Sequence, residues 1–252
     1  MLELNKIYNE DCLEGMERIE DGSIDMILCD LPYGTTQCKW DNIIPFDSLW
    51  EQYKRIIKVN GAIVLMAGQP FTSALVMSNP KLFRYEWIWE KHKGTNFYQA
   101  KTAPMKIHES VLVFSKEKVD YFPQMTDGDI YTKRSSKHKL PKDHVMTPGK
   151  SIGYSKTLDT SKRYPVSIQY YSNHNQKENR LHPTQKPVSL FEYLVKTYTN
   201  ENEIVLDNCM GSGTTAIACL NTNRNYIGFE LDKEYYQSAT ERILNHKEKE
   251  LV

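Results

Sequence analysis

The motif D-L-P-Y at residues 30–33 is the first stretch of the chain whose residue types could carry chemistry. It follows an apolar run, residues 24–29, that is typical of a buried strand. A proline and Gly34 end such a strand abruptly, which leaves Asp30 and Tyr33 at its carboxyl end, where ligands bind in open parallel sheets. A carboxylate beside an aromatic face suits a flat ring with an exocyclic amine, such as a nucleobase. A surface turn capped by Asp30 would give the same pattern, so this motif alone leaves both interpretations open.

A glycine-rich segment at residues 207–216, D-N-C-M-G-S-G-T-T-A, is the second candidate. It lies between an expected strand, 204–206, and an expected helix, 214–220. Glycines let a ligand approach the backbone, and a helix amino terminus favours negative charge. The spacing fits the permissive G-x-G-x-x-G/A form of nucleotide-binding loops, and no Gly-Lys-Ser/Thr follows, so it is not a P-loop. Glu230, just after the next expected strand at 225–229, is placed to accept hydrogen bonds from ribose hydroxyls.

Asp207 favours one cofactor over another. An acid at the strand end would repel the pyrophosphate of a nicotinamide cofactor, whereas it would attract the ammonium group of a methionine tail. S-adenosylmethionine is therefore the expected cofactor, and a nicotinamide-dependent dehydrogenase is the weaker alternative. Asp11 also follows a short strand and could accept from an adenine amine, although a plain helix N-cap explains it equally well.

The hydrophobic periodicity predicts an α/β chain of short strands and amphipathic helices. The strands at 82–90 and 109–115 resemble the antiparallel edge often added to such sheets, with a basic loop between them at 91–106. Strands are expected at 4–9, 24–29, 62–67, 82–90, 109–115, 204–206 and 225–229, and helices at 12–19, 46–59, 71–77, 187–198, 214–220 and 233–249.

Both candidate loops are expected at one edge of a single sheet. A cofactor-binding half needs several parallel strands beside its glycine loop, but only one more strand fits after Gly213. The missing strands must come from the amino-terminal half, so the strand ending at Asp30 should lie beside the strand that ends at Asp207. The order of the two halves is then permuted, and the substrate and cofactor sites adjoin.

The stretch 116–180 differs in composition from the rest of the chain. It has little apolar periodicity, and basic residues alternate with aromatic residues and amides, which suits a nucleic-acid face. A solvated, partly disordered insert is the alternative. The candidate DNA-binding residues are Lys133, Arg134, Lys137, Lys139 and Arg163.

Composition limits the classes of protein further. The formal net charge is zero, so affinity for nucleic acid must come from local patches. The five cysteines form no C-x-x-C pair, and they read as small buried residues in a reducing compartment rather than as disulfides or metal ligands. No signal-peptide core or membrane span is apparent, so a cytoplasmic, nucleoid-associated protein is expected. No metal is expected, since the cysteines lack the spacing of metal ligands.

These motifs, in this order, resemble the permuted β class of DNA amino-methyltransferases. In that family a D-P-P-Y motif precedes the target-recognition region, H-P-T-Q-K-P follows it, and D-P-F-x-G-S-G-T-T comes last. This chain has D-L-P-Y at 30–33, H-P-T-Q-K-P at 182–187 and D-N-C-M-G-S-G-T-T at 207–215. Leu31 replaces a proline, and Asn208 and Cys209 replace the Pro-Phe pair, which removes an aromatic ring from the cofactor pocket and could weaken cofactor binding.

The resemblance implies a Rossmann-like, circularly permuted methyltransferase sheet. Residues 1–115 would form its catalytic half, 116–180 the target-recognition insert, and 181–252 its cofactor-binding half. The catalytic residues would be Asp30, Leu31, Pro32 and Tyr33. The cofactor-binding residues would be Asp11, Cys12, Asp30, Thr184, Lys186, Asp207, Asn208, Cys209, Gly211, Gly213, Thr214 and Glu230.

The resemblance also implies a reaction. Asp30 and the Leu31 carbonyl would accept the two hydrogens of an exocyclic amine, Pro32 would shape the loop, and Tyr33 would stack on a base flipped out of double-stranded DNA. An acid as the first motif residue favours adenine over the cytosine amine. RNA or a protein glutamine as substrate, and a DNA-binding module with a degenerate cofactor site, remain as alternatives. A homodimer and a companion restriction endonuclease are further expectations.

Overall fold

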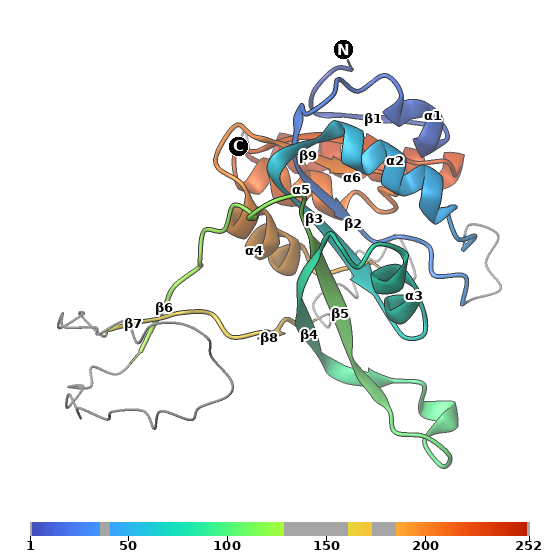
Figure 1. The fold of residues 1–252 in the computed structure, drawn as a ribbon, viewed down its shortest axis with the longest axis vertical. Helices are drawn as coiled ribbons and strands as arrows, with labels where there is room; N and C mark the ends of the chain where they lie inside the picture. Colours follow the sequence, from blue (N-terminus) through green and yellow to red (C-terminus); the bar gives the residue numbers. More distant parts are fainter. Residues whose placement is uncertain (1, 36–40, 129–160, 173–184, 251–252) are drawn as a thin grey trace. The chain divides into compact units, whose positions relative to one another are not determined.

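A computed structural model describes residues 2–35, 41–128, 161–172 and 185–250 (Figure 1). These residues form two compact units, one made of residues 1–122 and 166–252, the other of residues 123–165. In the larger unit the strands are β1 (Lys6–Tyr8), β2 (Ile24–Cys29), β3 (Ile57–Ala67), β4 (Phe83–Thr95), β5 (Lys106–Phe114), β8 (Ile168–Tyr170), β9 (Ile204–Asp207) and β10 (Asn225–Phe229). Its helices are α1 (Cys12–Met16), α2 (Phe46–Ile56), α3 (Phe71–Ser78), the 3₁₀ turn η1 (Phe97–Gln99), α4 (Val188–Tyr198), α5 (Thr214–Asn221) and α6 (Lys233–Glu250).

One eight-stranded sheet organises the larger unit, in the order β1-β10-β9-β2-β3-β5-β4-β8. The first five strands are parallel, and β5 is antiparallel to both of its neighbours. The expected pairing of the two motif strands is confirmed, because Met26 and Ile27 of β2 lie opposite Val205 and Leu206 of β9. The two loops that follow these strands therefore leave the same edge of the sheet.

Helices cover both faces of the sheet. Helices α1, α2 and α3 bury residues such as Trp50 and Tyr53 against one face. Helices α4, α5 and α6 bury residues such as Phe191 and Ile217 against the other. All six residues of β2 are buried, as expected for a central strand whose two faces are both covered. The sequence predicted this mostly parallel α/β architecture and its antiparallel edge correctly.

Several expected boundaries were wrong. Helix α2 ends at Ile56, and β3 begins directly at Ile57 rather than at residue 62. Gly61 therefore lies inside β3, where an added Cβ would come within 2.7 Å of the Asp25 carbonyl oxygen. The expected loop at 91–106 is largely a continuation of β4 and β5 as a hairpin. Most of this extension is exposed to solvent, so it needs no apolar alternation and gave no strand signal; the exposed residues are His92, Lys93, Thr95, Ile107 and His108.

The stretch that the sequence set apart as an insert contributes one strand to the main sheet. Strand β8 pairs with β4 at its edge, Ile88 opposite Ile168. The second unit contains the short antiparallel pair β6 (Thr126–Asp127) and β7 (Lys162–Arg163). Target recognition by this stretch stays a prediction.

The described cysteines are free, and three of them are buried, as the sequence predicted. In the described ranges no helix combines the length and low polarity that a bilayer span requires.

Candidate active site

The two motif loops line one cavity of about 1110 Å³ at the carboxyl ends of the parallel strands. The loop after β2 contributes residues 30–33 and the loop after β9 contributes residues 207–212. Asp11 and Glu230 line the same cavity, after β1 and β10. The expected placement of both motif loops at one edge is therefore observed, and Asp11 and Glu230 line the same cavity beside them.

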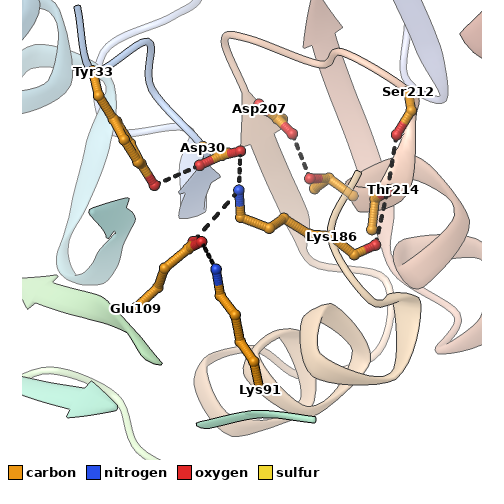
Figure 2. A network of polar contacts seen from close by, with 9 residues as sticks. Asp30, Tyr33, Lys91, Glu109, Lys186, Asp207, Ser212 and Thr214 are labelled. Carbon is orange, nitrogen blue, oxygen red and sulfur yellow. Dashed lines mark hydrogen bonds and ion pairs between the residues drawn. The ribbon is translucent and has the colours of Figure 1, made fainter. Parts of the chain in front are cut away.

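Asp30 lies at the end of β2 with both carboxylate oxygens engaged (Figure 2). Its Oδ1 accepts a hydrogen bond from the Tyr33 hydroxyl at 2.8 Å, and its Oδ2 lies 2.5 Å from Lys186 Nζ. Burial raises the pKa of Asp30, and the neighbouring Lys186 ammonium opposes that shift. A carboxylate with a raised pKa is a stronger proton acceptor than an exposed aspartate, provided that a cation keeps it ionised.

Two sets of contacts position the Tyr33 ring and the loop that follows it. It stacks on Phe71, with ring centroids 5.1 Å apart and planes inclined by 22°. Asp41 anchors the loop that follows by accepting from the backbone N–H groups of Gly34 and Thr35 at 2.8 and 2.9 Å. Because Phe71 covers one face of Tyr33, a planar substrate would stack on the other.

Lys186 belongs to a compact network of two acids and two lysines (Figure 2). Besides its ion pair with Asp30, its Nζ lies 3.6 Å from Glu109 Oε2, and Lys91 pairs with the other oxygen of Glu109. The Lys186 and Glu109 side chains are only 8% and 13% exposed. The formal charges of the four groups cancel, which makes their burial tolerable.

The network shifts the pKa values of its members in opposite directions. Burial works against the Lys186 ammonium, but the Asp30 and Glu109 carboxylates raise its pKa above the usual value. Burial works against ionised Glu109, but the Lys186 and Lys91 ammonium groups bring its pKa below the usual value. Both of these pKa shifts favour the charged forms, the ammonium of Lys186 and the carboxylate of Glu109.

Sequence reasoning missed two members of this network. Glu109 and Lys91 lie within strands β5 and β4, and both line the cavity. A charged residue in an otherwise apolar strand, close to the ligand edge, was the available signal for Glu109. Lys186 was expected at the carboxylate of the cofactor. In this structure it forms an ion pair with Asp30, and its contact with the cofactor stays a prediction.

The glycine loop is organised around Asp207. This buried carboxylate accepts from the Cys209 backbone N–H at 3.0 Å and from the Thr215 hydroxyl at the start of α5. Gly211 and Gly213 adopt positive φ angles of 53° and 78°, which the turn into α5 requires. An added Cβ at Gly211 would approach only a backbone oxygen 3.9 Å away, so the loop leaves open space there.

Asn208, one of the two departures from the glycine-loop motif of the family, is buried. Its Oδ1 accepts from the Tyr53 hydroxyl at 2.5 Å, and its Nδ2 lies 3.6 Å from the sulfur atoms of both Cys12 and Cys209. The side chain thus ties the loop to α2. Cys209 itself is partly exposed to the cavity.

Glu230 connects the end of β10 to the glycine loop. Its Oε2 accepts from the Gly211 N–H at 2.7 Å and its Oε1 from the Asp232 N–H at 2.9 Å. Each oxygen keeps a lone pair for a hydroxyl donor. Asp11 caps α1, as expected, with its Oδ1 2.7 Å from the Leu13 N–H.

Several predicted site residues are not tested by these contacts. Thr184, Lys133, Arg134, Lys137 and Lys139 lie outside the described residues. Arg163 is in β7 of the second unit.

The chain matches the sequence model of a DNA methylase family, the N6/N4 methyltransferases, over residues 24–241. It belongs to this family. Among the relatives of this DNA methylase, the type II methyltransferase M1.MboII of Moraxella bovis is 28% identical, covering 98% of this chain and 99% of its own. The type II methyltransferase M.HpaI of Haemophilus parainfluenzae is also 28% identical, over 94% of this chain and 74% of its own length. The DNA adenine methyltransferase YhdJ of Escherichia coli K12 is 26% identical, over 96% and 83%.

Solved structures share the fold. The M1.HpyAVI–SAM complex superposes with a TM-score of 0.64 at 24% identity, over 94% of this chain and 98% of that one. The cytosine-N4-specific PvuII DNA methyltransferase gives 0.65 at 18% identity, over 97% and 91%. The predicted fold, family and S-adenosylmethionine-dependent class are confirmed. These neighbours do not separate adenine from cytosine as the target.

We expect cofactor affinity to depend on pH through Asp207. Burial raises the pKa of Asp207 to about 7, although the Thr215 and Cys209 donors oppose this shift. A cationic methionine tail favours the ionised carboxylate, so binding below that pKa must release a proton. Affinity should fall about tenfold per pH unit below about pH 7. Calorimetric titrations of wild type and Asp207→Asn check this: the variant should bind more weakly at pH 7, without this slope, and an equal slope in both would contradict the assignment.

Proposed function

We propose that this DNA methylase transfers a methyl group from S-adenosylmethionine to the exocyclic amine of an adenine flipped out of double-stranded DNA. The observation that carries the proposal is the half-buried Asp30 carboxylate, which lies with Tyr33 in the same cavity as the glycine loop. The adenine specificity of the relative YhdJ supports the choice of base, as does the acid at the first motif position.

The residues along the cavity suit the cofactor. Asp207 carries negative charge where an ammonium group would lie, Glu230 offers lone pairs to ribose hydroxyls, and Asp11 can accept from an adenine amine. Gly211 leaves the backbone accessible. When bound, S-adenosylmethionine supplies an electrophilic methyl group on a sulfonium centre.

Asp30 has the central task because a nucleobase amine is a poor nucleophile: its lone pair is delocalised into the ring. By accepting one hydrogen of the amine, with the carbonyl of buried Leu31 accepting the other, Asp30 would hold the nitrogen toward tetrahedral geometry, so that its lone pair is localised on the nitrogen and points at the methyl group. The carboxylate then stabilises the positive charge that develops on the nitrogen. It can also accept the surplus proton, which passes on to water.

Tyr33 would bind the flipped base between its free face and the cavity wall. Its hydroxyl is fixed by Asp30, so the ring and the carboxylate keep a constant relative orientation. Flipping is required because the amine of a base paired in the duplex cannot reach a carboxylate inside the cavity.

Modification mapping tests the proposal. Plasmid DNA that lacks methylation is incubated with the protein and S-adenosylmethionine and sequenced as single molecules. Methylated adenines at one short motif are expected. Methylated cytosine amines would retain the chemistry and overturn the base, an outcome that the fold shared with the PvuII enzyme makes the second candidate. Unmodified DNA with folded, cofactor-binding protein would reject DNA as substrate, in favour of RNA, protein or a binding module.

Replacing Glu230 by glutamine should weaken cofactor binding about tenfold, because a neutral amide accepts less strongly from hydroxyls and from the Gly211 N–H. Calorimetry measures the change. Glu234→Gln, an exposed acid of α6, is the matched control and should bind like wild type. Equal affinity in the Glu230 variant would remove this residue from the site.

The partners and the location of this chain are further proposals. The relatives M1.MboII and M.HpaI are type II methyltransferases, which supports a companion restriction endonuclease for this chain as well. A homodimer and a cytoplasmic, nucleoid-associated location complete the expectation. Light scattering of the purified protein tests the oligomeric state.

A further inference from the structure

The hairpin formed by β4 and β5 is strongly basic at its distal end. Between Glu90 and Glu109 the chain has four lysines, two histidines and no acid, although its overall net charge is zero. Lys91 is committed to the buried network with Glu109, but Lys93 and Lys101 are exposed. The end of the hairpin therefore carries a local excess of positive charge.

Two large aromatic rings stand at the hairpin tip. Phe97 and Tyr98 are 79% and 81% exposed, within the 3₁₀ turn η1. The turn is entered through Asn96, whose φ of 65° is left-handed and directs the chain back toward β5. Met105, just before β5, and Ile107, within β5, are also exposed. Aromatic groups at this exposure, surrounded by lysines, indicate a binding surface.

The hairpin projects past the rest of the sheet and borders the active-site cavity. Strand β3 pairs with β5 only as far as Ser110, whereas the β4–β5 pairing continues to Thr95 and Lys106 (Figure 1). Thr95, Asn96, Tyr98 and Lys106 line the cavity that contains Asp30. The hairpin tip therefore forms part of the cavity wall.

We propose that this hairpin is an arm that holds duplex DNA at the cavity mouth, with Phe97 and Tyr98 stacking on the bases left exposed when the target base leaves the helix. This inference rests on the proposed function. Lys93 and Lys101 contact backbone phosphates, because a surface with lysines and no acidic residues attracts their negative charge. When the two rings stack on the bases beside the vacated position, they stabilise the opened duplex.

The charge favours DNA over a second copy of the chain as occupant. An isologous contact would bring two acid-free, lysine-bearing tips together, and like charges at an interface repel. A phosphate backbone instead neutralises them and leaves the aromatic rings facing bases.

The lysines are tested by the salt dependence of DNA binding. For Lys93→Gln/Lys101→Gln, the slope of the logarithm of affinity against the logarithm of salt concentration should fall by about 2, at about 0.9 per phosphate contact. A fluorescein-labelled duplex is the probe. Lys54→Gln/Lys81→Gln is the control, because these exposed lysines lie near the amino ends of β3 and β4, away from the cavity. An unchanged slope in the hairpin variant would overturn the proposal.

The aromatic rings are tested by base flipping. Once mapping has located the target base, a duplex with 2-aminopurine at that position reports its unstacking by fluorescence. Phe97→Ala/Tyr98→Ala should reduce the fluorescence gain and raise KM for DNA by about tenfold or more. Val59→Ala, an exposed residue at the amino end of β3, should behave like wild type.

The outcomes separate the arm from the function itself. If wild type methylates DNA and the aromatic variant flips and binds equally well, the arm proposal fails alone. If the variant instead loses an oligomeric state by light scattering while DNA affinity holds, the tip is a protein interface and the proposal is wrong. If wild type modifies no DNA, the proposed function fails first.

Discussion

Replacing Asp30 by alanine is expected to lower the rate of methyl transfer by about 10³-fold, because it removes the group that orients the amine and stabilises its developing charge. Cofactor affinity should stay within about threefold of wild type, since Asp207 and Glu230 are unaffected by this change. The measurement is single-turnover transfer of a labelled methyl group to DNA. The expected loss is therefore in the chemical step rather than in binding.

The control for this variant is Asp47→Ala, which removes an exposed carboxylate from the first turn of α2. Circular dichroism establishes that both variants are folded, which matters because Asp30→Ala leaves Lys186 with Glu109 as its nearest acid. Retention of more than about a tenth of the wild-type rate in Asp30→Ala would contradict the assigned role. A loss of rate below about tenfold is too small for the removal of the charged group that orients the amine.

Replacing Lys186 by methionine is expected to move the acidic limb of the pH–rate profile to higher pH. The reaction needs ionised Asp30, so activity is lost as pH falls through the pKa of this group. Lys186 keeps that pKa down, and without it Glu109 would raise the pKa of Asp30 further. A shift of about 1–3 pH units is expected for the loss of an adjacent cation. Activity should return at alkaline pH, which a merely structural role for Lys186 would not produce.

Glu109→Gln should move the acidic limb of the pH–rate profile to lower pH. Removing Glu109 takes away a negative charge that raises the pKa of Asp30, and it leaves Lys186 paired with Asp30 alone. The Asp30 carboxylate is then engaged more strongly by the ammonium group, so kcat should fall by about tenfold while KM for DNA changes little. Combining Glu109→Gln with Lys186→Met should bring the limb back toward the wild-type position. Additive losses without movement of the limb would contradict coupling through Asp30.

The sequence was most informative where local chemistry ends a strand. Asp30 and Asp207 each close a short apolar run, and glycine or proline follows within a few residues, so both loops could be placed at the ligand edge. The pairing of β2 with β9 could be inferred by counting strands, because the carboxyl-terminal half was too short to build a sheet alone.

Other features depend on contacts that no local pattern records. Glu109 meets Lys186 only because β5 lies next to β3 and the chain returns after residue 185 to the same edge. The extension of β4 to Thr95 arises from pairing with β5, although His92, Lys93 and Thr95 are exposed to solvent. Nor could the hydrogen bond between Asn208 and Tyr53 be read from the motif, where asparagine only marked a departure from the family.

The most direct test of the account is nucleoside analysis of DNA after reaction with S-adenosylmethionine that carries a deuterated methyl group. Mass spectrometry of the hydrolysed DNA should find labelled N6-methyladenine with wild type and none with Asp30→Ala. Labelled N4-methylcytosine would contradict the choice of base. The absence of label on any exocyclic amine, from folded protein that binds the cofactor, would contradict the central claim that Asp30 directs methyl transfer to a flipped base.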